Sequence, residues 1–272
     1  MHNDLYLWTS SAGDDVVIKL YVKTDRNRVE REWAALTLLA PHGLTTVPAP
    51  LWLDHTPAEP AIGMSRLHGQ PLLEATDKMA ALRALAHTTA RLQTVRLTGL
   101  LATLPRIDTG EHYMIRLTQT WPQMLASQAD DSLAPAMRKL LTTWQRSGDA
   151  DLVTTPTTPV LSRGDANLLN WMITDTGAGC VDFEYAGYST VPFDAADSSS
   201  TSPAGPSRTT SGPGAARPRH HRCNRRQFAA NQRTCALRWL AVLWKQRDHR
   251  RADFDTQHAR VEMLHSNDNP YT

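Results

Sequence analysis

Residues 161–197 limit the fold and chemistry of this chain most, because two aspartates and an asparagine occur there at short spacing. Asp165 and Asn170 share one loop, RGDANLLN, and Asp182 follows an apolar run in the sequence VDFE. Mg²⁺ takes oxygen ligands and keeps several waters, so one amide and one carboxylate suffice from the protein. We therefore interpret Asn170 and Asp182 as metal ligands and Asp165 as the catalytic carboxylate of a phosphoryl transfer. The alternative is an ordinary loop, since Asp and Asn are common in turns.

Three segments carry a family resemblance: RGDANLLN, then VDFEYAG, then FDAAD. They resemble the aminoglycoside phosphotransferase and choline kinase family, whose signature reads H-G-D-x-x-x-x-N followed by D-F-E or D-W-E. The resemblance implies a protein-kinase-like fold, with Asp165 as catalytic residue, Asn170 and Asp182 as metal ligands and Asp194 as a structural residue. The chain departs from the commonest signature at Arg163, where that signature has His.

The N-terminal part predicts a small antiparallel sheet followed by one helix. Residues 5–8 and 16–22 are typical of strands joined by a polar turn, and 28–40 has the apolar spacing of a helix. Lys19 lies within the second strand, where a lysine is most often structural. The resemblance instead implies that Lys19 contacts nucleotide phosphates and that Glu32, rather than Glu30, is its partner. It also implies that the family's first strand is missing, with residues 1–3 as a remnant of the nucleotide loop.

A proline-rich segment, 41–60, leads to the strand predicted within residues 61–69. In a bilobal kinase this strand ends at the hinge between the lobes. We expect residues 64–67 to line the adenine site, and we assign Met64 and Arg66 to nucleotide binding. An ordinary strand and turn would explain the same residues.

The remaining sequence predicts a mainly helical lobe. Helices are expected at 77–95 with Asp77 as N-cap, and at 111–128, 133–147, 228–247 and 253–264. The predicted fold class is α+β, a bilobal protein-kinase-like fold. We place a nucleotide-binding lobe at 1–66 and a catalytic and substrate lobe at 67–272.

The segment 198–225 breaks the pattern, because it lacks large apolar residues and is rich in Ser, Pro, Gly and Arg. Such a composition predicts disorder, since little apolar surface is available to offset the entropy of ordering. Two alternatives stay open. The arginines could bind nucleic acid, or the stretch could be translated out of frame.

Composition limits the class of partner and the compartment. The formal net charge of +2 argues against a dedicated nucleic-acid binder. Three cysteines, Cys180, Cys223 and Cys235, form no metal-type spacing or disulfide framework, which favours a reduced cytoplasmic protein. No stretch is apolar enough for a membrane span. We therefore expect no nucleic-acid and no membrane partner.

The predicted function is that of an enzyme, a phosphotransferase that uses ATP or GTP with Mg²⁺ and an alcohol group as acceptor. The acceptor is expected to be a small molecule, such as an aminoglycoside or another antibiotic-like alcohol. Asp130, Asp131 and Glu184 would favour a cationic acceptor, unless they are solvated surface charges. The alternative is an inactive or nucleotide-binding-only pseudokinase from a damaged gene.

Overall fold

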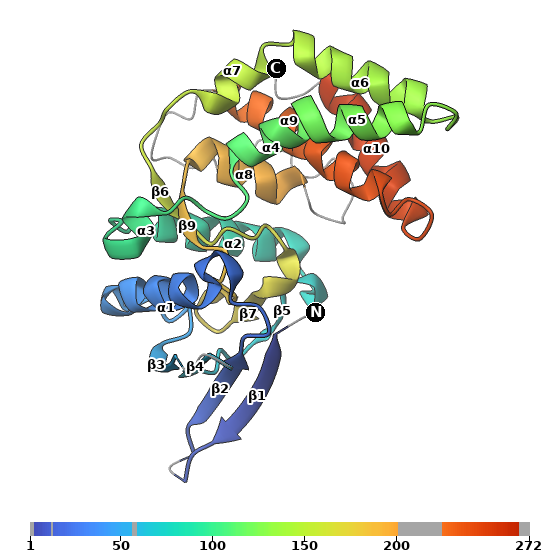
Figure 1. Cartoon of the computed structure of the whole chain (residues 1–272). Helices are drawn as coiled ribbons and strands as arrows, with labels where there is room; N and C mark the ends of the chain where they lie inside the picture. The colour runs from blue at the N-terminus through green and yellow to red at the C-terminus, as the bar shows by residue number, and fades with distance from the viewer. Residues whose placement is uncertain (1–2, 12, 56–58, 201–224, 267–272) are drawn as a thin grey trace. The chain divides into compact units, whose positions relative to one another are not determined.

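The computed structural model of the chain describes residues 3–11, 13–55, 59–200 and 225–266 (Figure 1). The chain divides into two compact units, each of which combines two segments of the sequence. The first unit is Met1–Ile107 with Pro159–Ser189, and the second is Asp108–Thr158 with Thr190–Thr272. The first unit therefore joins the N-terminal strands to the loop that carries Asp165. The lobe boundary at residue 66 stays a prediction.

The first unit contains nine strands, three α-helices and four short 3₁₀ turns among its described residues. Its strands are β1 (Asp4–Thr9), β2 (Asp15–Leu20), β3 (Pro50–Asp54), β4 (Ala61–Ser65), β5 (Gln70–Pro71), β6 (Val160–Ser162), β7 (Trp171–Thr174), β8 (Gly177–Cys180) and β9 (Gly187–Ser189). Its helices are α1 (Arg28–Leu39), α2 (Lys78–Gln93) and α3 (Gly99–Thr103), and its 3₁₀ turns are η1 (Asp25–Asn27), η2 (Ala40–His42), η3 (Leu72–Glu74) and η5 (Leu168–Asn170).

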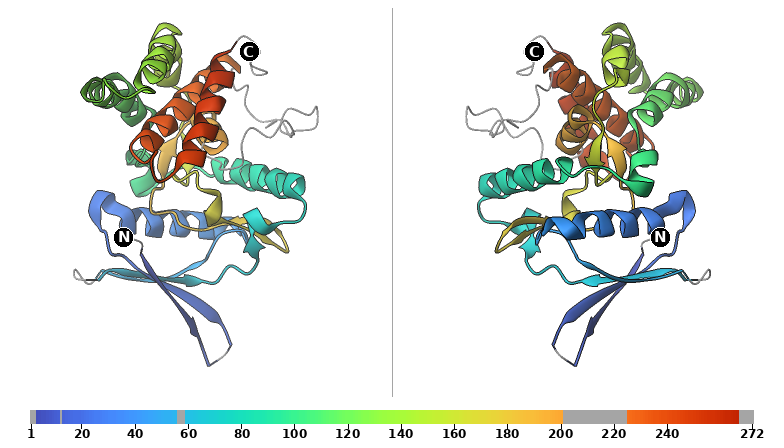
Figure 2. Two further views of the ribbon diagram at one scale, coloured as in Figure 1. Left: turned by 90° about the vertical axis from the view of Figure 1, so that its right-hand side faces the viewer. Right: turned by 90° about the vertical axis from the view of Figure 1, so that its left-hand side faces the viewer.

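The largest sheet is antiparallel, with strand order β1-β2-β4-β3. Helix α1 packs against β3 and β4 on one face of this sheet (Figure 2). Lys19 of β2 lies opposite Leu5 of β1 on one side and Ile62 of β4 on the other. Because side chains alternate along a strand, the odd-numbered residues of β2 share one face, and Val17 and Lys19 point the same way. The predicted hairpin and helix are confirmed here.

Apolar side chains from separate parts of the sequence form one core in this unit. Helix α1 contributes a buried stripe that includes Leu36 and Leu39, and the same cluster contains Ile62, Leu161 and Phe183. Burying such side chains stabilises the unit by about 1.5–3 kcal/mol for each. The core thereby fixes the segment after β8 against the N-terminal sheet and helix, which matters for the site described below.

The second unit is helical among its described residues. Its elements are α4 (Gly110–Ile115), the π-helical turn η4 (Arg116–Thr120), α5 (Trp121–Ser127), α6 (Ala134–Arg146), α7 (Asp149–Thr154), α8 (Val191–Ser200), α9 (Arg225–Trp244) and α10 (Arg251–His265). The helix predicted at 111–128 is thus present with a π turn in its middle.

Helix α9 is the centre of the second unit, because α7, α8 and α10 all pack against it. The predicted apolar stripe of α6 enters this core, with Met137, Leu141 and Trp144 buried. A buried ion pair accompanies the apolar contacts. Asp149 accepts two hydrogen bonds from Arg233, at 2.6 and 2.7 Å.

The segment predicted to be disordered, 198–225, lies mostly outside the described residues. Its two ends are described, and there the prediction is wrong. Residues 198–200 form the last turn of α8, and Arg225 begins α9. Ser200 is buried and its hydroxyl donates to the carbonyl of Gln232, which explains why small polar residues can end a packed helix. Among the described residues, no helix combines the length and apolar character needed to cross a membrane.

Candidate active site

Lys19 and Glu32 form a buried ion pair between β2 and α1. The ammonium Nζ of Lys19 lies 2.6 Å from Oε2 of Glu32, and the two residues are 5% and 1% exposed. Glu32 also accepts hydrogen bonds from the Tyr21 hydroxyl and the Phe183 backbone N–H, at 2.5 and 3.1 Å. Glu30 is exposed. The structure therefore brings together the lysine and the glutamate that the resemblance selected.

Two more carboxylates contact the same ammonium. Nζ of Lys19 lies 2.6 Å from Oδ1 of Asp182 and 3.2 Å from Oε2 of Glu184. Burial by itself lowers the pKa of Lys19, but the carboxylates of Glu32, Asp182 and Glu184 outweigh it and hold that pKa above its usual value. The lysine is therefore a permanent cation in this site.

Tyr21 stays protonated beside this cluster. Burial, followed by the negative charge of Glu32, raises the pKa of the Tyr21 hydroxyl well above its usual range. Its O–H consequently remains a donor to Glu32. This hydrogen bond holds one carboxylate oxygen of Glu32, while the Phe183 N–H holds the other.

The β7–β8 hairpin brings the predicted metal ligands together. Trp171 at the start of β7 pairs with Cys180 at the end of β8, so the residues just outside the hairpin are neighbours. The Val181 N–H donates to the carbonyl of Asn170 at 3.1 Å. The side-chain Nδ2 of Asn170 then donates to Asp182 Oδ2 at 3.3 Å.

The same amide reaches the predicted catalytic carboxylate. Nδ2 of Asn170 donates to Oδ2 of Asp165 at 2.7 Å, and the Asn167 backbone N–H donates to Oδ1 at 3.0 Å. The Asp165 side chain is 32% exposed and that of Asp182 is 31% exposed. Asp165, Asn170 and Asp182 thus form one connected group that a ligand in solution can reach.

Two backbone conformations in this group are unusual. Asp182 has a φ of +67°, a left-handed conformation that is rare for residues other than glycine. Gly164 has a φ of +86°, and a Cβ at this position would lie 2.0 Å from the Tyr185 carbonyl oxygen. Only glycine fits there. Such conformations cost about 1–3 kcal/mol in other residues and tend to persist at functional sites.

Arg163 stands where the signature described above has His, and its hydrogen bonds hold the loop that carries Asp165 in place. It is 8% exposed, and its guanidinium carbon lies 5.6 Å from the centre of the Trp171 ring. It donates to the backbone carbonyls of Asp165, Val181 and Asp182. A guanidinium presents several donors in a fixed plane, so one arginine can link both ligand-bearing segments.

Glu184 is not a solvated surface charge, which corrects one of the two readings of that residue. It is 6% exposed, and its carboxylate also accepts from Arg28 Nη1 at 3.1 Å and from the Asn3 amide. Asp131 pairs with Arg247 at 2.6 Å. Both carboxylates are thus already neutralised by cations. Sequence reasoning missed Arg28, because its role depends on the approach of residue 184 to α1.

The two residues assigned to the hinge lie in different environments. Met64 is a buried core residue of β4, opposite Val17. Arg66 is exposed, and its guanidinium binds Asp15 at 2.9 Å while its backbone N–H donates to the Asp15 carbonyl at 3.1 Å. Neither residue contacts the group around Asp165 through any hydrogen bond between described residues, and their nucleotide roles stay predictions.

Register identifies two further candidates that sequence reasoning missed. Leu7 lies opposite Val17, and Val17 lies opposite Met64, so these three side chains form a row on the face that carries Lys19. Leu7 is 55% exposed. Val17 precedes Lys19 by two residues, so the alternation of side chains along a strand could have identified Val17 from the sequence. The strand register, which selects Leu7, is not visible in the sequence.

The oxygen atoms of this group fit a magnesium ion. Asp182 offers a partly exposed carboxylate, and Asn170 donates through its nitrogen, which leaves the amide oxygen without a donor among the described residues. Carboxylate and amide oxygens are ligands that Mg²⁺ accepts. Glu32, Asp182 and Glu184 form a second carboxylate group, with oxygen atoms within 4.8 Å of one another. Lys19 already contacts all three of these carboxylates, so that group is satisfied without a metal.

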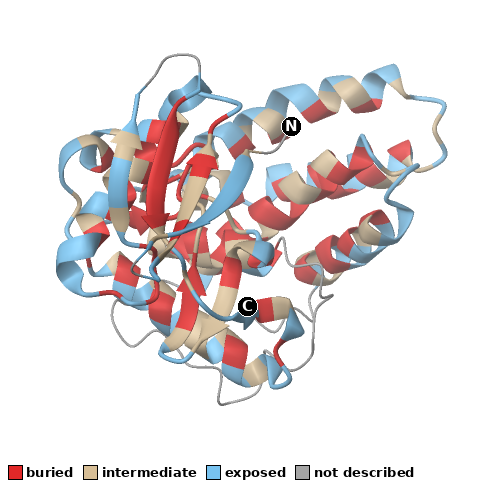
Figure 3. Cartoon of the chain, turned by 90° about the horizontal axis from the view of Figure 1, so that it is seen from below, coloured by how far each residue is buried: buried red, intermediate tan, exposed pale blue. Residues whose placement is uncertain are grey.

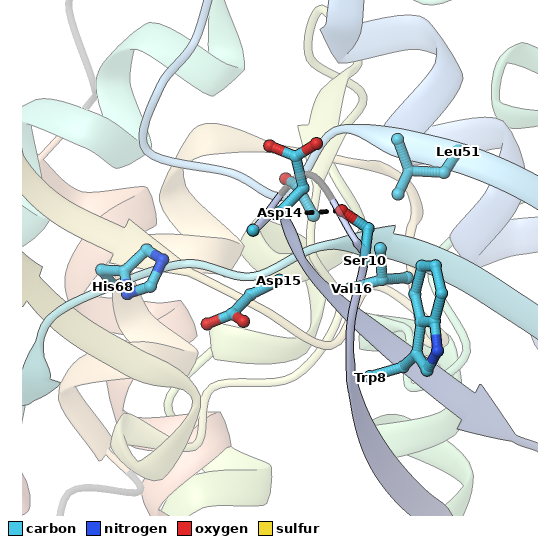
Figure 4. Close-up of a pocket in the computed structure, with 9 residues that line it drawn as sticks. Trp8, Ser10, Asp14, Asp15, Val16, Leu51 and His68 are labelled. Carbon is cyan, nitrogen blue, oxygen red and sulfur yellow. Dashed lines mark hydrogen bonds between the residues drawn. The ribbon is translucent and has the colours of Figure 1, made fainter.

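A separate hollow of about 610 Å³ lies beside the tip of the β1–β2 hairpin. Trp8, Val16 and Ser65 line it together with Leu51 and His68 (Figure 4). Trp8, Val16 and Ser65 are paired across β1, β2 and β4, and by alternation they face away from Lys19. The hollow therefore does not belong to the group of charged residues described above.

Comparison with known proteins agrees with this geometry. Residues 1–211 match the model of the phosphotransferase enzyme family. No curated protein matches the sequence.

Three solved structures illustrate the shared fold. The AMP-bound spectinomycin phosphotransferase APH(9)-Ia has 11% sequence identity and a TM-score of 0.62, with 97% of this chain and 90% of that chain covered. A choline/ethanolamine kinase family protein from Mesorhizobium loti has 16% identity and a TM-score of 0.61, with 98% and 90% covered. A thermostable mutant of aminoglycoside phosphotransferase APH(4)-Ia has 13% identity and a TM-score of 0.57, with 96% and 94% covered.

These identities are low, so the three structures establish the architecture alone. The family model, in contrast, spans more than half of the chain and includes both Lys19 and the Asp165 loop. The fold is the predicted kinase-like fold, with an antiparallel sheet and a larger helical part. The chain therefore belongs to the phosphotransferase enzyme family, together with aminoglycoside phosphotransferases and choline kinases.

Proposed function

We propose that this chain transfers the γ-phosphate of ATP, or of GTP, to a hydroxyl group of a small molecule, with Mg²⁺ as cofactor. The observation that carries the proposal is a continuous set of contacts. Lys19 bonds to Asp182, Asn170 bonds to Asp182, and Asn170 bonds to Asp165. Phosphoryl transfer requires a phosphate-binding cation, metal ligands and a proton acceptor close together.

Each side chain has one role in the reaction. As the hydroxyl oxygen of the acceptor forms a bond to the γ-phosphorus, Asp165 accepts the proton of that hydroxyl. In the same step the bond from the γ-phosphorus to the β-phosphate oxygen breaks. Asn170 and the Asn167 N–H hold the two carboxylate oxygens of Asp165, which fixes its direction. Orientation of this kind supplies much of the rate of such transfers.

Asn170 and Asp182 would hold the magnesium ion, which offsets the negative charge of the phosphates when bound. Lys19 would donate to phosphate oxygens, with Glu32 holding its ammonium in place. The row of Leu7, Val17 and Met64 would cover the base, because it presents an apolar surface on the face of Lys19. The backbone N–H groups of Ser65 and Arg66 already donate to the carbonyls of Ala49 and Asp15. The polar edge of the base would therefore bind to backbone carbonyls of this segment or to residues that follow it in the chain.

The acceptor class follows from the family and not from a contact in this chain. Aminoglycosides, other antibiotic-like alcohols and choline-like alcohols are the candidates, since spectinomycin phosphotransferase and a choline/ethanolamine kinase share the fold.

Two free cysteines, Cys180 and Cys235, are buried. Burial raises the pKa of the Cys180 thiol to about 12. Unreactive buried thiols suit a reduced compartment, and we propose the cytoplasm, with no nucleic-acid partner.

A second candidate is a nucleotide-binding protein without transfer activity. The observation that favours it is the saturation of Lys19, which contacts three carboxylates. Nucleotide phosphates must displace at least one of them to reach the ammonium. If they cannot displace one, the chain would bind nucleotide weakly and transfer nothing.

Nucleotide binding and transfer can be measured separately. Isothermal titration with ATP and with GTP, each with and without Mg²⁺, is expected to show Mg²⁺-dependent binding. Release of ADP is then followed with spectinomycin, gentamicin, choline and ethanolamine as acceptors. Glu32→Ala is expected to weaken nucleotide binding, whereas Glu30→Ala, the exposed control in the same helix, leaves it unchanged.

The outcomes discriminate between the candidates. Acceptor-dependent ADP release that Asp165→Asn abolishes supports transfer. Binding without any acceptor-dependent release supports the second candidate. A chain that binds neither nucleotide contradicts both, and an equal effect of Glu30→Ala contradicts the assignment of the Lys19 partner.

A further inference from the structure

Arg28 lies where the local structure disfavours a cation. It is the first residue of α1, and the N-terminus of a helix carries partial positive charge that repels an arginine. The two residues before it, Arg26 and Asn27, have left-handed φ angles of +59° and +57°, which are rare outside glycine. The Arg28 side chain is nonetheless only 13% exposed. These local costs indicate that a contact with a distant segment holds Arg28 in place.

That contact is the carboxylate of Glu184, which lies between two cations. Its Oε1 accepts a hydrogen bond from Arg28 Nη1 at 3.1 Å, and its Oε2 lies 3.2 Å from Lys19 Nζ. The Asn3 amide also donates to Oε2. The guanidinium carbon of Arg28 lies 4.9 Å from the centre of the Tyr185 ring, which adds a second contact with the same segment. Arg28 and Lys19 therefore share one carboxylate.

Water screens these charges weakly. Glu184 is 6% exposed, and Lys19 is paired with β4, the most buried of the four strands in the largest sheet (buried residues are red in Figure 3). Charges with little water between them interact over several ångströms. A change of one unit charge at Glu184 or at Arg28 should therefore be felt at the Lys19 ammonium.

We propose that Arg28 and Glu184 are positioning residues that set how strongly Lys19 binds nucleotide phosphates. This role rests on the proposed function, in which Lys19 donates to phosphate oxygens. The Glu184 carboxylate and a phosphate are both anions, so they compete for the same ammonium. Arg28 offsets the charge of Glu184 and holds one of its oxygens, which weakens that competition. Among the described residues, Glu184 alone of the three carboxylates around Lys19 forms an ion pair with an arginine.

The charge balance predicts effects of opposite sign for the two residues. Arg28→Gln leaves one uncompensated negative charge beside Lys19, so ATP should bind about tenfold more weakly. Glu184→Gln removes the competing charge, so ATP should bind more tightly than to the natural chain. The variant with both substitutions restores the balance and should match the natural chain. An ion pair with a structural role only would give weaker binding whichever partner is removed.

Isothermal titration of the full chain with ATP measures these changes, and adenosine is the ligand without phosphate. The ATP affinity should respond and the adenosine affinity should not, since adenosine has no phosphate to compete with Glu184. Arg26→Gln is the matched control. It removes the same charge from a nearby arginine whose side chain is 57% exposed, and it should leave the ATP affinity unchanged. Arg28→Lys keeps the charge and should retain most of the ATP affinity.

Magnesium must be varied in these titrations, because Glu184 lies two residues from the proposed metal ligand Asp182. The fold-changes are measured at low and at high MgCl₂ and should be the same at both, since the competition concerns Lys19 and not the ion. Changes that disappear at high MgCl₂ would place the effect on the metal and overturn the proposal. Circular dichroism verifies that each variant is folded.

The remaining outcomes are equally decisive. Unchanged ATP affinity in Arg28→Gln, weaker ATP binding by Glu184→Gln, or an equal change for adenosine would each overturn the proposal and leave the proposed function in place. If Arg28→Gln does not fold, Glu184→Gln decides by itself, because only competition for Lys19 predicts tighter binding. A natural chain that binds no ATP would instead contradict the proposed function, and with it this role.

Discussion

Replacing Lys19 by methionine should destabilise the first unit at neutral pH, because it removes the cation shared by three carboxylates. Glu32 and Asp182 each lie 2.6 Å from the Lys19 ammonium, and Glu184 lies 3.2 Å away. Methionine fills much of the same volume, so the main loss is the charge. Arg28 remains bonded to Glu184, but Glu32 and Asp182 lose the cation that separates them.

The size of the effect follows from the distances. Oxygen atoms of the three carboxylates lie within 4.8 Å of one another. Two unit charges at this separation repel by roughly 3.5 kcal/mol at an effective dielectric constant of about 20. Removal of one partner from a buried ion pair typically costs about 3–5 kcal/mol. A loss of this size is a large part of the usual stability of a domain, and it should lower the unfolding temperature by roughly 10 °C.

The dependence on pH and on metal ions separates this mechanism from lost packing. In the natural chain the pKa of Lys19 is raised above 10.5, so its contribution is fully present below that pH and is lost only in strongly alkaline solution. Its stabilisation is thus constant between pH 5 and 8. In the variant, protonation of one carboxylate relieves the repulsion, so the loss should shrink at pH 5. A divalent cation should also stabilise the variant by occupying the carboxylate group.

Thermal unfolding followed by circular dichroism measures these effects at pH 7 and pH 5, with and without MgCl₂. Lys23→Met, at an exposed lysine, is the control and should leave the unfolding temperature unchanged. An equal loss at both pH values, insensitive to the cation, would mean that packing and not charge dominates. No loss at pH 7 would refute the electrostatic reasoning itself.

Three further predictions concern the proposed catalytic residues, the loop that carries Asp165 and the second unit. Asp182→Asn should abolish Mg²⁺-dependent nucleotide binding in titration calorimetry, whereas Asp165→Asn should retain binding and lower turnover by about a hundredfold or more; the reverse pattern would exchange their roles. Gly164→Ala should lower the free energy of unfolding in urea by at least about 1–3 kcal/mol, because its Cβ would meet the Tyr185 carbonyl at a φ of +86°; an unchanged midpoint would contradict this. Burial lowers the pKa of His265, so only the unfolded chain gains a proton near pH 6.5, and stability should fall as the pH drops below that value until the lowered folded pKa is passed. His265→Gln should flatten this dependence, and an unflattened curve would exclude His265 as its source.

Much of the site could be read from the sequence because its chemistry is local. Asp165 and Asn170 lie five residues apart in one loop, and the resemblance paired Lys19 with Glu32. The hairpin, helix α1 and the N-cap at Asp77 follow from short-range patterns, and Asp77 does accept a hydrogen bond from the Ala80 N–H. Alternation and helical spacing depend only on neighbours along the chain, so a single sequence contains them.

The tertiary structure decided which charged residues form ion pairs with one another. Glu184 resembled a surface carboxylate in sequence, yet folding places it against Lys19 and Arg28, more than 150 positions away. The row that adds Leu7 to Val17 depends on strand register, which is a long-range choice. Burial and pairing arise only when distant segments meet, and the residue types in one segment do not specify which segments those are.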